Sequence, residues 1–361
     1  MKTFFKMFMA AVLILVSNSA FPAPSLEDIR KAADQGDAAA QYNLGIRYEI
    51  GYSVAQNMDQ AKAWYRKAAK SGDPRAQCEL GGIYLSANAY NYPLGDKYLH
   101  ANFGNFGGLK KNKQAAKWFC KAAKGLPQMA EQGDARAQRL LGLMYFQGFC
   151  VAEDKALSAE WLRKSLESFH ERAKQGDIEA QHELATIYAD NVYIKGAKQT
   201  AVEWYRKAAE QGDVKAQYQL GRYYYYGYAG VVKSRPQALE WFQKAAEQED
   251  AEAQYMLGLD CFNSGEAPPE RLMEAFKWCN KAAEQGHVDA YGLLGVMYGS
   301  SYGGLAQDDT LSFKWFLKAA EQGDGRAMNH VIHMYQQGIG VTQNRAKAHE
   351  WAKKKFPHIL K

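Results

Sequence analysis

The sequence predicts an all-α protein, a right-handed superhelical α/α solenoid of about eight helix-pair repeats. Its tryptophans all stand at the same place in one repeated segment, and the last five follow one another at intervals of 37, 37, 37 and 36 residues. A second phrase, GDxxAQxxLGxxY, recurs upstream of them, so that units start near residues 36, 72, 133, 176, 212, 249, 286 and 323. Self-similarity at such a period is typical of stacked repeats. The tryptophans are Trp64, Trp118, Trp161, Trp204, Trp241, Trp278, Trp315 and Trp351.

Both phrases have the spacing of amphipathic helices. In the first unit, small and apolar residues at Ala40, Leu44 and Tyr48 form one helical stripe, and Ala61, Trp64 and Ala68 form another. A glycine turn that recurs between the two phrases ends the first helix and lets the second fold back. Each unit is therefore predicted to be an antiparallel helix pair that needs its neighbours to bury its apolar faces.

The glycine inside the first helix, Gly45 in the first unit, carries further information. Glycine within a helix costs about 0.5–1 kcal/mol relative to alanine, so its recurrence indicates a close approach of the neighbouring helix. We expect the bulky Trp and Tyr residues to fill the space beside it. Trp204 and Trp241 are accordingly expected to be buried between helices.

The chain has distinct segments at its start. Residues 1–20 carry Lys2 and Lys6, an apolar run and then small residues, the pattern of a secretory signal peptide, with cleavage expected after Ala20 or alternatively after Ser19. Residues 21–35 are expected to form an N-terminal capping helix opened by a capping box at 25–28. Residues 36–361 are predicted to be the solenoid. The protein is expected to be located in the periplasm, with no stable membrane anchor.

Two features interrupt the regular repeat. A stretch rich in Tyr, Asn and Gly at 86–112 lies between the helices of the second unit. The helices that contain Trp118 and Trp161 run 7 residues further than the others, about two extra turns.

The five cysteines do not follow the repeat. An odd number leaves at least one thiol without a partner in an oxidising compartment. Only Cys78 and Cys120 look opposed, at the start of one helix and the end of the next, whereas Cys261 and Cys279 are expected to pack as small apolar residues. Cys150 has no evident mate.

Charge and motifs exclude several functions. The net charge is +6 with acidic and basic residues interleaved, so no basic stripe points to nucleic acid. No catalytic motif is present, and no cofactor or metal is expected, because His330 and His333 lack a third ligand nearby. The aspartate of each Gly-Asp is expected to cap the following helix.

The remaining candidates are surfaces. If the first helix of each unit lines the concave side, its off-stripe residues face a groove, and Tyr, Arg and Phe there match the composition of interface cores. The insertion resembles a recognition loop. The alternative is that these rings pack between repeats or fold back on the helices. The predicted partner-binding residues are Tyr42, Arg136, Arg139, Phe146, Tyr218, Arg222, Tyr225, Tyr226, Tyr255 and Phe262 in the groove, and Tyr90, Tyr92 and Tyr98 in the insertion.

The repeated phrases resemble the Sel1-like repeat family, a cousin of the tetratricopeptide repeat. The resemblance implies a helical superhelix that acts as a non-enzymatic adaptor or scaffold, expected here to be a monomer. Family members with a secretory leader include immunity proteins that neutralise phospholipase effectors of type VI secretion, which is the function expected for this chain. The alternative is an adaptor for an envelope sensor or a cell-wall enzyme. A sugar-binding role is disfavoured, because the tryptophans are expected in the core.

Overall fold

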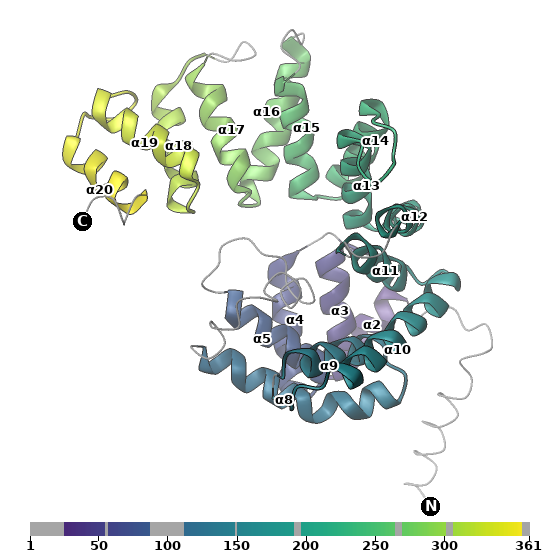
Figure 1. Cartoon of the computed structure of the whole chain (residues 1–361). Coiled ribbons are helices and arrows are strands. Elements are labelled where there is room, and N and C mark those ends of the chain that lie inside the picture. The colour runs from purple at the N-terminus through teal and green to yellow at the C-terminus, as the bar shows by residue number, and fades with distance from the viewer. Residues whose placement is uncertain are drawn as a thin grey trace, which may run out of the picture.

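The computed structural model describes residues 25–54, 57–86, 112–148, 150–190, 196–263, 269–300 and 306–355. Throughout these residues the secondary structure is helical, with no strand (Figure 1). The helices are α2 Leu26–Asp34, α3 Ala38–Ile50, α4 Met58–Ser71, α5 Pro74–Ser86, α8 Lys113–Glu131, α9 Ala135–Gln147, α10 Lys155–Lys174, α11 Ile178–Asp190, α12 Ala197–Glu210, α13 Val214–Tyr226, α14 Arg235–Glu247, α15 Ala251–Asn263, α16 Pro269–Glu284, α17 Val288–Gly299, α18 Asp309–Glu321, α19 Gly325–Gln337 and α20 Arg345–Lys355.

The helices pair as the repeat predicts, and the predicted all-α solenoid is confirmed. Each unit consists of a first helix (α3, α5, α9, α11, α13, α15, α17 or α19) packed on the second helix that follows it. Figure 1 shows α2–α10 gathered into one tight turn, with α14–α20 following as a more open arc. The predicted capping helix is α2, which starts at a capping box on Ser25 and covers α3 with Ile29 and Ala33.

The repeated aspartates cap the first helices, as predicted. In α13, for example, the Asp213 carboxylate accepts a hydrogen bond from the Ala216 amide at 2.7 Å. In the seventh unit His287 replaces the aspartate, and its Nδ1 accepts from the Ala290 amide at 3.2 Å. The caps therefore explain why an acceptor recurs here without any catalytic role.

The glycine inside the first helix marks a close helix contact, as predicted, but the tryptophan does not fill it. A Cβ on Gly221 would stand 2.7 Å from the ring of Phe242, the residue after Trp241. The same relation holds for Gly45 with Tyr65, Gly81 with Phe119, Gly142 with Leu162, Gly258 with Cys279 and Gly295 with Phe316. In these six units the side chain that follows the tryptophan is therefore the one that enters the helix pair.

The tryptophans stand at the edge of the core. Trp204 is buried, with 8% exposed, but Trp241 and the others are half-buried, so the prediction for Trp241 was wrong. A lysine three residues later covers every indole ring, as Lys244 covers Trp241 with its ammonium 4.2 Å from the ring centre. This cation–π contact keeps the exposed part of the ring covered. The other pairs are Lys67–Trp64, Lys121–Trp118, Lys164–Trp161, Lys207–Trp204, Lys281–Trp278, Lys318–Trp315 and Lys354–Trp351.

A buried glutamine ties successive units together. The Gln217 amide donates to the Ala209 carbonyl of the preceding helix at 3.1 Å, and its oxygen accepts from Gln248 at 2.8 Å. Equivalent bonds to the preceding helix are made by Gln41, Gln77, Gln138, Gln181 and Gln254. Tyr291 and Met328 take this position in the last two units, where the core is apolar instead.

The two predicted helix extensions are confirmed. The helices α8 and α10 have 19 and 20 residues, whereas α4 and α12 have 14. The insertion at 86–112 lies outside the described residues, apart from its ends.

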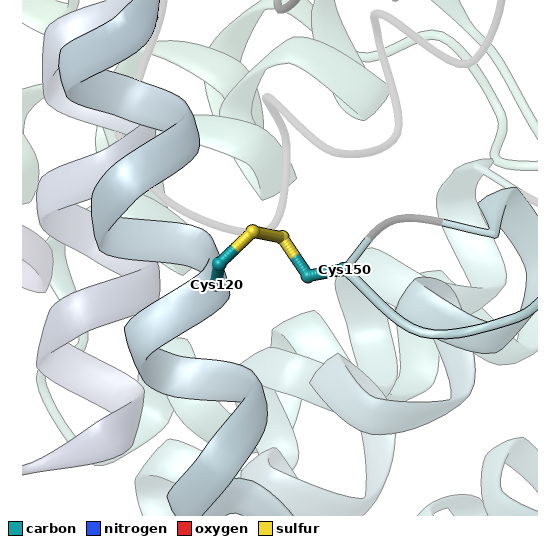
Figure 2. Close-up of a disulfide and its surroundings, with 2 residues drawn as sticks. All are labelled: Cys120 and Cys150. Atoms are coloured by element: carbon teal, nitrogen blue, oxygen red, sulfur yellow. A yellow bond between two sulfur atoms is a disulfide. The ribbon is translucent and has the colours of Figure 1, made fainter.

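The sequence left the disulfide pairing open, and the structure does not pair Cys78 with Cys120. Cys120 on α8 forms a disulfide with Cys150 in the turn after α9 (Figure 2). Cys78 is buried inside the first helix α5, where it faces the apolar core around Phe119 rather than the surface where Cys120 lies. Cys261 and Cys279 are buried in the apolar core, as predicted.

We expect the disulfide to be detectable by thiol counting. Under denaturing conditions without reductant, a maleimide should label three cysteines, and Cys78→Ser should lower that count by one. The Cys120→Ser/Cys150→Ser variant should unfold with about 2–4 kcal/mol less free energy, since the bridge closes a loop of 30 residues. Labelling of all five cysteines before reduction would contradict the bridge.

Candidate protein-binding surface

The first helices line the inner side of the solenoid. The helix α5 contacts α9 directly, and α15 contacts α17. The Arg136 side chain on α9 reaches back two units and donates to the Tyr42 hydroxyl on α3 at 3.2 Å. First helices of different units therefore approach one another, as expected of the concave side, and the second helices lie outside.

In the N-terminal half this inner side is filled by the protein's own charged residues. Glu183 on α11 accepts from Arg136 and, at 2.8 Å, from Arg139. Arg75 bonds to the Asp134 carboxylate at 2.6 Å and to Asp73 at 2.7 Å. Opposite charges thus compensate one another across units two to four in a buried environment. We call these residues, together with Glu179, the charged cluster.

Three predicted binding residues belong to this buried region. Tyr42, Arg139 and Arg136 are 1%, 2% and 9% exposed. Burial raises the pKa of the Tyr42 hydroxyl well above its ordinary value, so it stays neutral. The expectation that these side chains face an open groove was wrong, because the units curve tightly enough for their first helices to meet.

In the C-terminal half the inner side is more open. Lys215 on α13 bonds to the Asp250 carboxylate at 2.8 Å, and Tyr218 donates to Glu252 at 3.2 Å. The Glu252 carboxylate is 49% exposed and lies 3.4 Å from the His287 Nε2. These contacts join neighbouring units at their edges and leave part of the inner side exposed.

The Glu252 carboxylate should make stability depend on pH. Its hydrogen bond with His287, despite the opposing effect of burial, lowers its pKa from 4.5 to about 2, with Lys215 and Tyr218 also facing it. When a carboxylate has a lower pKa in the folded state than in the unfolded state, its ionised form stabilises the fold at a pH above the unfolded-state pKa. This stabilisation is lost as the pH falls toward the folded-state pKa. The unfolding free energy of wild type should exceed that of Glu252→Gln at about pH 6, and the gap should shrink by about pH 2.5. A gap that does not change with pH would contradict this.

A continuous aromatic stripe runs along α13 and past its end. Tyr218, Arg222 and Tyr225 are half-buried, whereas Tyr226 is 42% and Tyr228 is 55% exposed. The Tyr226 ring lies 5.0 Å from that of Tyr225 and stacks on Tyr228 at 5.3 Å. We call these five residues the α13 face. The sequence analysis missed Tyr228, because it stands in the turn after the helix.

Tyr225 is partly a core residue. Its ring centre lies 6.0 Å from that of buried Phe242. Burial and the nearby Asp260 carboxylate, which accepts its hydrogen bond, raise the pKa of its hydroxyl. Tyr225 therefore supports the α13 face from below, and Tyr226 is the ring that is accessible.

The remaining predicted binding residues stand on elements other than α13. Tyr255 stacks on His287 at 4.7 Å and is half-buried, as is Phe262 on the same helix, α15. Phe146, 43% exposed, is at the end of α9, far along the chain from α13. Tyr90, Tyr92 and Tyr98 lie outside the described residues. The structure thus brings Tyr218, Arg222, Tyr225 and Tyr226 together on α13, with Tyr255 packed on the same core cluster as Tyr218 and Tyr225. Tyr42, Arg136 and Arg139 come together separately, in the buried N-terminal half.

Sites for other chemistry are not apparent in the described part of the chain. No three His, Cys, Asp or Glu residues there gather as ligands for a metal ion. His330 stacks on Phe316 at 4.2 Å, so its ring packs against the core edge. None of the described helices is long and apolar enough to cross a membrane.

The fold defines a class of protein, the α/α repeat solenoid. Sel1 repeats match residues 38–73, 94–125, 135–168, 178–213, 214–250, 251–287, 288–324 and 327–354. The chain belongs to the Sel1 repeat family, whose members serve as protein-interaction scaffolds.

Solved structures resemble the chain over most of its length. A Sel1 repeat protein from Oxalobacter formigenes is 29% identical, with 96% of this chain and 89% of that one covered and a TM-score of 0.52. The protein c5321, a protective antigen of uropathogenic Escherichia coli strains, is 31% identical over 93% of this chain and 80% of its own, with a TM-score of 0.50. The immunity protein Pa5087 from Pseudomonas aeruginosa is more distant, at 19% identity over 56% of this chain and 74% of its own, with a TM-score of 0.35.

Curated relatives match shorter stretches. The sel1-like repeat-containing protein L21 of Acanthamoeba polyphaga mimivirus is 28% identical over 144 residues, 35% of this chain and 25% of its own. The chitin synthase regulator SKT5 of Malassezia restricta is 37% identical over 54 residues, 15% of this chain and 4% of its own. The chain therefore spans a quarter or less of the length of these relatives.

Proposed function

We propose that this chain is a periplasmic immunity protein that neutralises a secreted, phospholipase-type effector by binding it stoichiometrically through the α13 face. The observation that carries the binding role is the exposed stack of Tyr226 and Tyr228 beside Arg222, on the open half of a solenoid whose other half is filled. Tyr and Arg are the residues in which binding energy concentrates when they become desolvated.

The proposed compartment has separate support. The pattern of residues 1–20 is that of a secretory leader. The Cys120–Cys150 disulfide is exposed, and such bridges persist in oxidising compartments but are rare in the cytosol. The effector class comes from the family resemblance alone, and it is therefore the part of the proposal that the experiment has to identify.

The test compares wild type with Tyr226→Ala as bait in a periplasmic extract. Replacing Tyr226 should weaken partner binding by at least about 2 kcal/mol, roughly thirtyfold, because the ring is accessible and fixed by its neighbours. Its melting temperature should hardly change, since this ring is 42% exposed and the neighbouring rings of Tyr225 and Tyr228 are half-buried or exposed. Tyr225→Ala should lower the melting temperature, because Tyr225 packs on Phe242.

The identity of the captured protein separates the candidates. A secreted lipase whose activity falls at a one-to-one ratio supports the immunity role. An envelope sensor or a cell-wall enzyme supports the adaptor role. A partner that binds wild type and Tyr226→Ala equally would show that the α13 face is not the interface, and would direct attention to the insertion at 86–112.

A further inference from the structure

Arg222 differs from the basic residues on the inner side of the solenoid that form ion pairs. Its one hydrogen bond within the described residues is a long one, 3.4 Å, to the side-chain oxygen of Gln219. Its guanidinium carbon lies 5.8 Å from the centre of the Tyr218 ring, and no described carboxylate pairs with it. The inner basic residues that do pair with carboxylates are Arg75, Arg136, Arg139, Lys215 and Arg326.

The surroundings of Arg222 hold the α13 face in place. Tyr218 is fixed by its hydrogen bond to Glu252 and by the Phe242 ring, 6.0 Å away. One turn beyond Arg222 along α13, Tyr226 stacks on Tyr228. The half-buried guanidinium of Arg222 has lost part of its hydration, which favours a hydrogen bond with a negatively charged ligand. The tyrosine rings are already held in place, so they lose little conformational entropy when a ligand binds.

The composition of the face selects the kind of ligand. Arg222 is the one charged residue among its five members, and Lys233 is exposed in the turn that follows, whereas nucleic acid would need a longer basic stripe. Past the end of α13 the face exposes the ring of Tyr228, which is 55% exposed, and Val232 further along the same turn is 83% exposed. A ligand with a carboxylate next to apolar side chains would complement both the positive charge of Arg222 and the exposed apolar area.

We propose that the α13 face binds an acidic side chain, Asp or Glu, that lies between apolar residues on the surface of the partner protein. The carboxylate accepts hydrogen bonds from the Arg222 guanidinium, which can hold it in bidentate fashion. The flanking apolar residues pack on Tyr226 and Tyr228. This inference rests on the proposed function and deepens it, since it names the chemistry that the partner must present.

A phage-displayed library of random peptides tests this without knowledge of the partner. Wild type should enrich peptides in which Asp or Glu stands beside Leu, Phe, Met or Pro, and Arg222→Glu should enrich Lys or Arg at that position instead. Arg66→Glu is the matched control, because Arg66 is an exposed arginine on the second helix α4 with no ionic partner in the described residues. This control should enrich the same acidic peptides as wild type.

A synthetic copy of the enriched peptide completes the test. Replacing its acidic residue by the amide should weaken binding to wild type about tenfold or more and leave binding to Arg222→Ala almost unchanged, as expected for two groups that contact each other. Enrichment without an acidic bias, no enrichment by wild type, or the same peptides from Arg222→Glu would overturn the inference. The periplasmic capture experiment is independent of this result, so a partner retained by Arg222→Glu would leave the protein-binding role standing.

Discussion

Replacing Phe242 by Ala is expected to lower the free energy of unfolding by about 3–5 kcal/mol, the usual cost of removing a buried aromatic ring. Phe242 is 0% exposed and lies against Gly221, which has no side chain to occupy the space left behind. Because each repeat is stabilised by its neighbours, the loss should extend to the units beside it. Urea unfolding followed by circular dichroism measures the change.

Trp241→Ala is the matched control in the adjacent position. The Trp241 ring is half-buried and covered by Lys244, so its removal should cost less, about 1–2 kcal/mol. An equal or larger loss in Trp241→Ala than in Phe242→Ala would mean that the tryptophan, not the residue after it, carries the packing of the repeat.

Glu183→Ala is expected to have an effect of similar size for an electrostatic reason. The carboxylate faces two guanidiniums, those of Arg136 and Arg139, and all three side chains are buried. Removing it leaves two buried positive charges with less compensation, which typically costs about 3–5 kcal/mol. Urea unfolding at neutral pH measures the loss.

An exposed ion pair in the same half of the chain provides the control for Glu183→Ala. Arg163 and Glu167 on α10 form a 2.6 Å pair with both side chains 61% exposed. Solvent screens such a pair, so Glu167→Ala should change the unfolding free energy by no more than about 0.5 kcal/mol. Similar losses of unfolding free energy in Glu183→Ala and Glu167→Ala would show that burial of the charged cluster does not increase its contribution to stability.

The repeat made the secondary structure predictable, because spacing within a unit determines which face of each helix is apolar. The position of Gly221 even indicated a close helix contact. The sequence could not tell which neighbour fills that contact, since Trp241 and Phe242 are both large rings, and one step along a helix decides which of them points inward.

The surface was harder to predict than the helices. Arg139 and Arg222 stand on corresponding faces of their helices, yet one is buried against Glu183 and the other has no described carboxylate partner. The difference depends on how tightly successive units curve, and curvature results from contacts between units that have no spacing signal. The Cys120–Cys150 bridge escaped prediction for a related reason, because it joins the second helix of one unit to the glycine turn of the next and the cysteines do not recur with the repeat.

Site-specific photo-crosslinking tests the central claim, that this solenoid binds a protein partner through the α13 face, most directly. A photoreactive amino acid replaces Tyr226 on that face, Arg163 on an outer helix, or Tyr92 in the insertion, and the cells that make the protein are irradiated. The account predicts one major adduct from position 226, with a protein whose activity the purified chain inhibits, and little adduct from position 163. Adducts from position 92 or 163 without one from position 226 would contradict it.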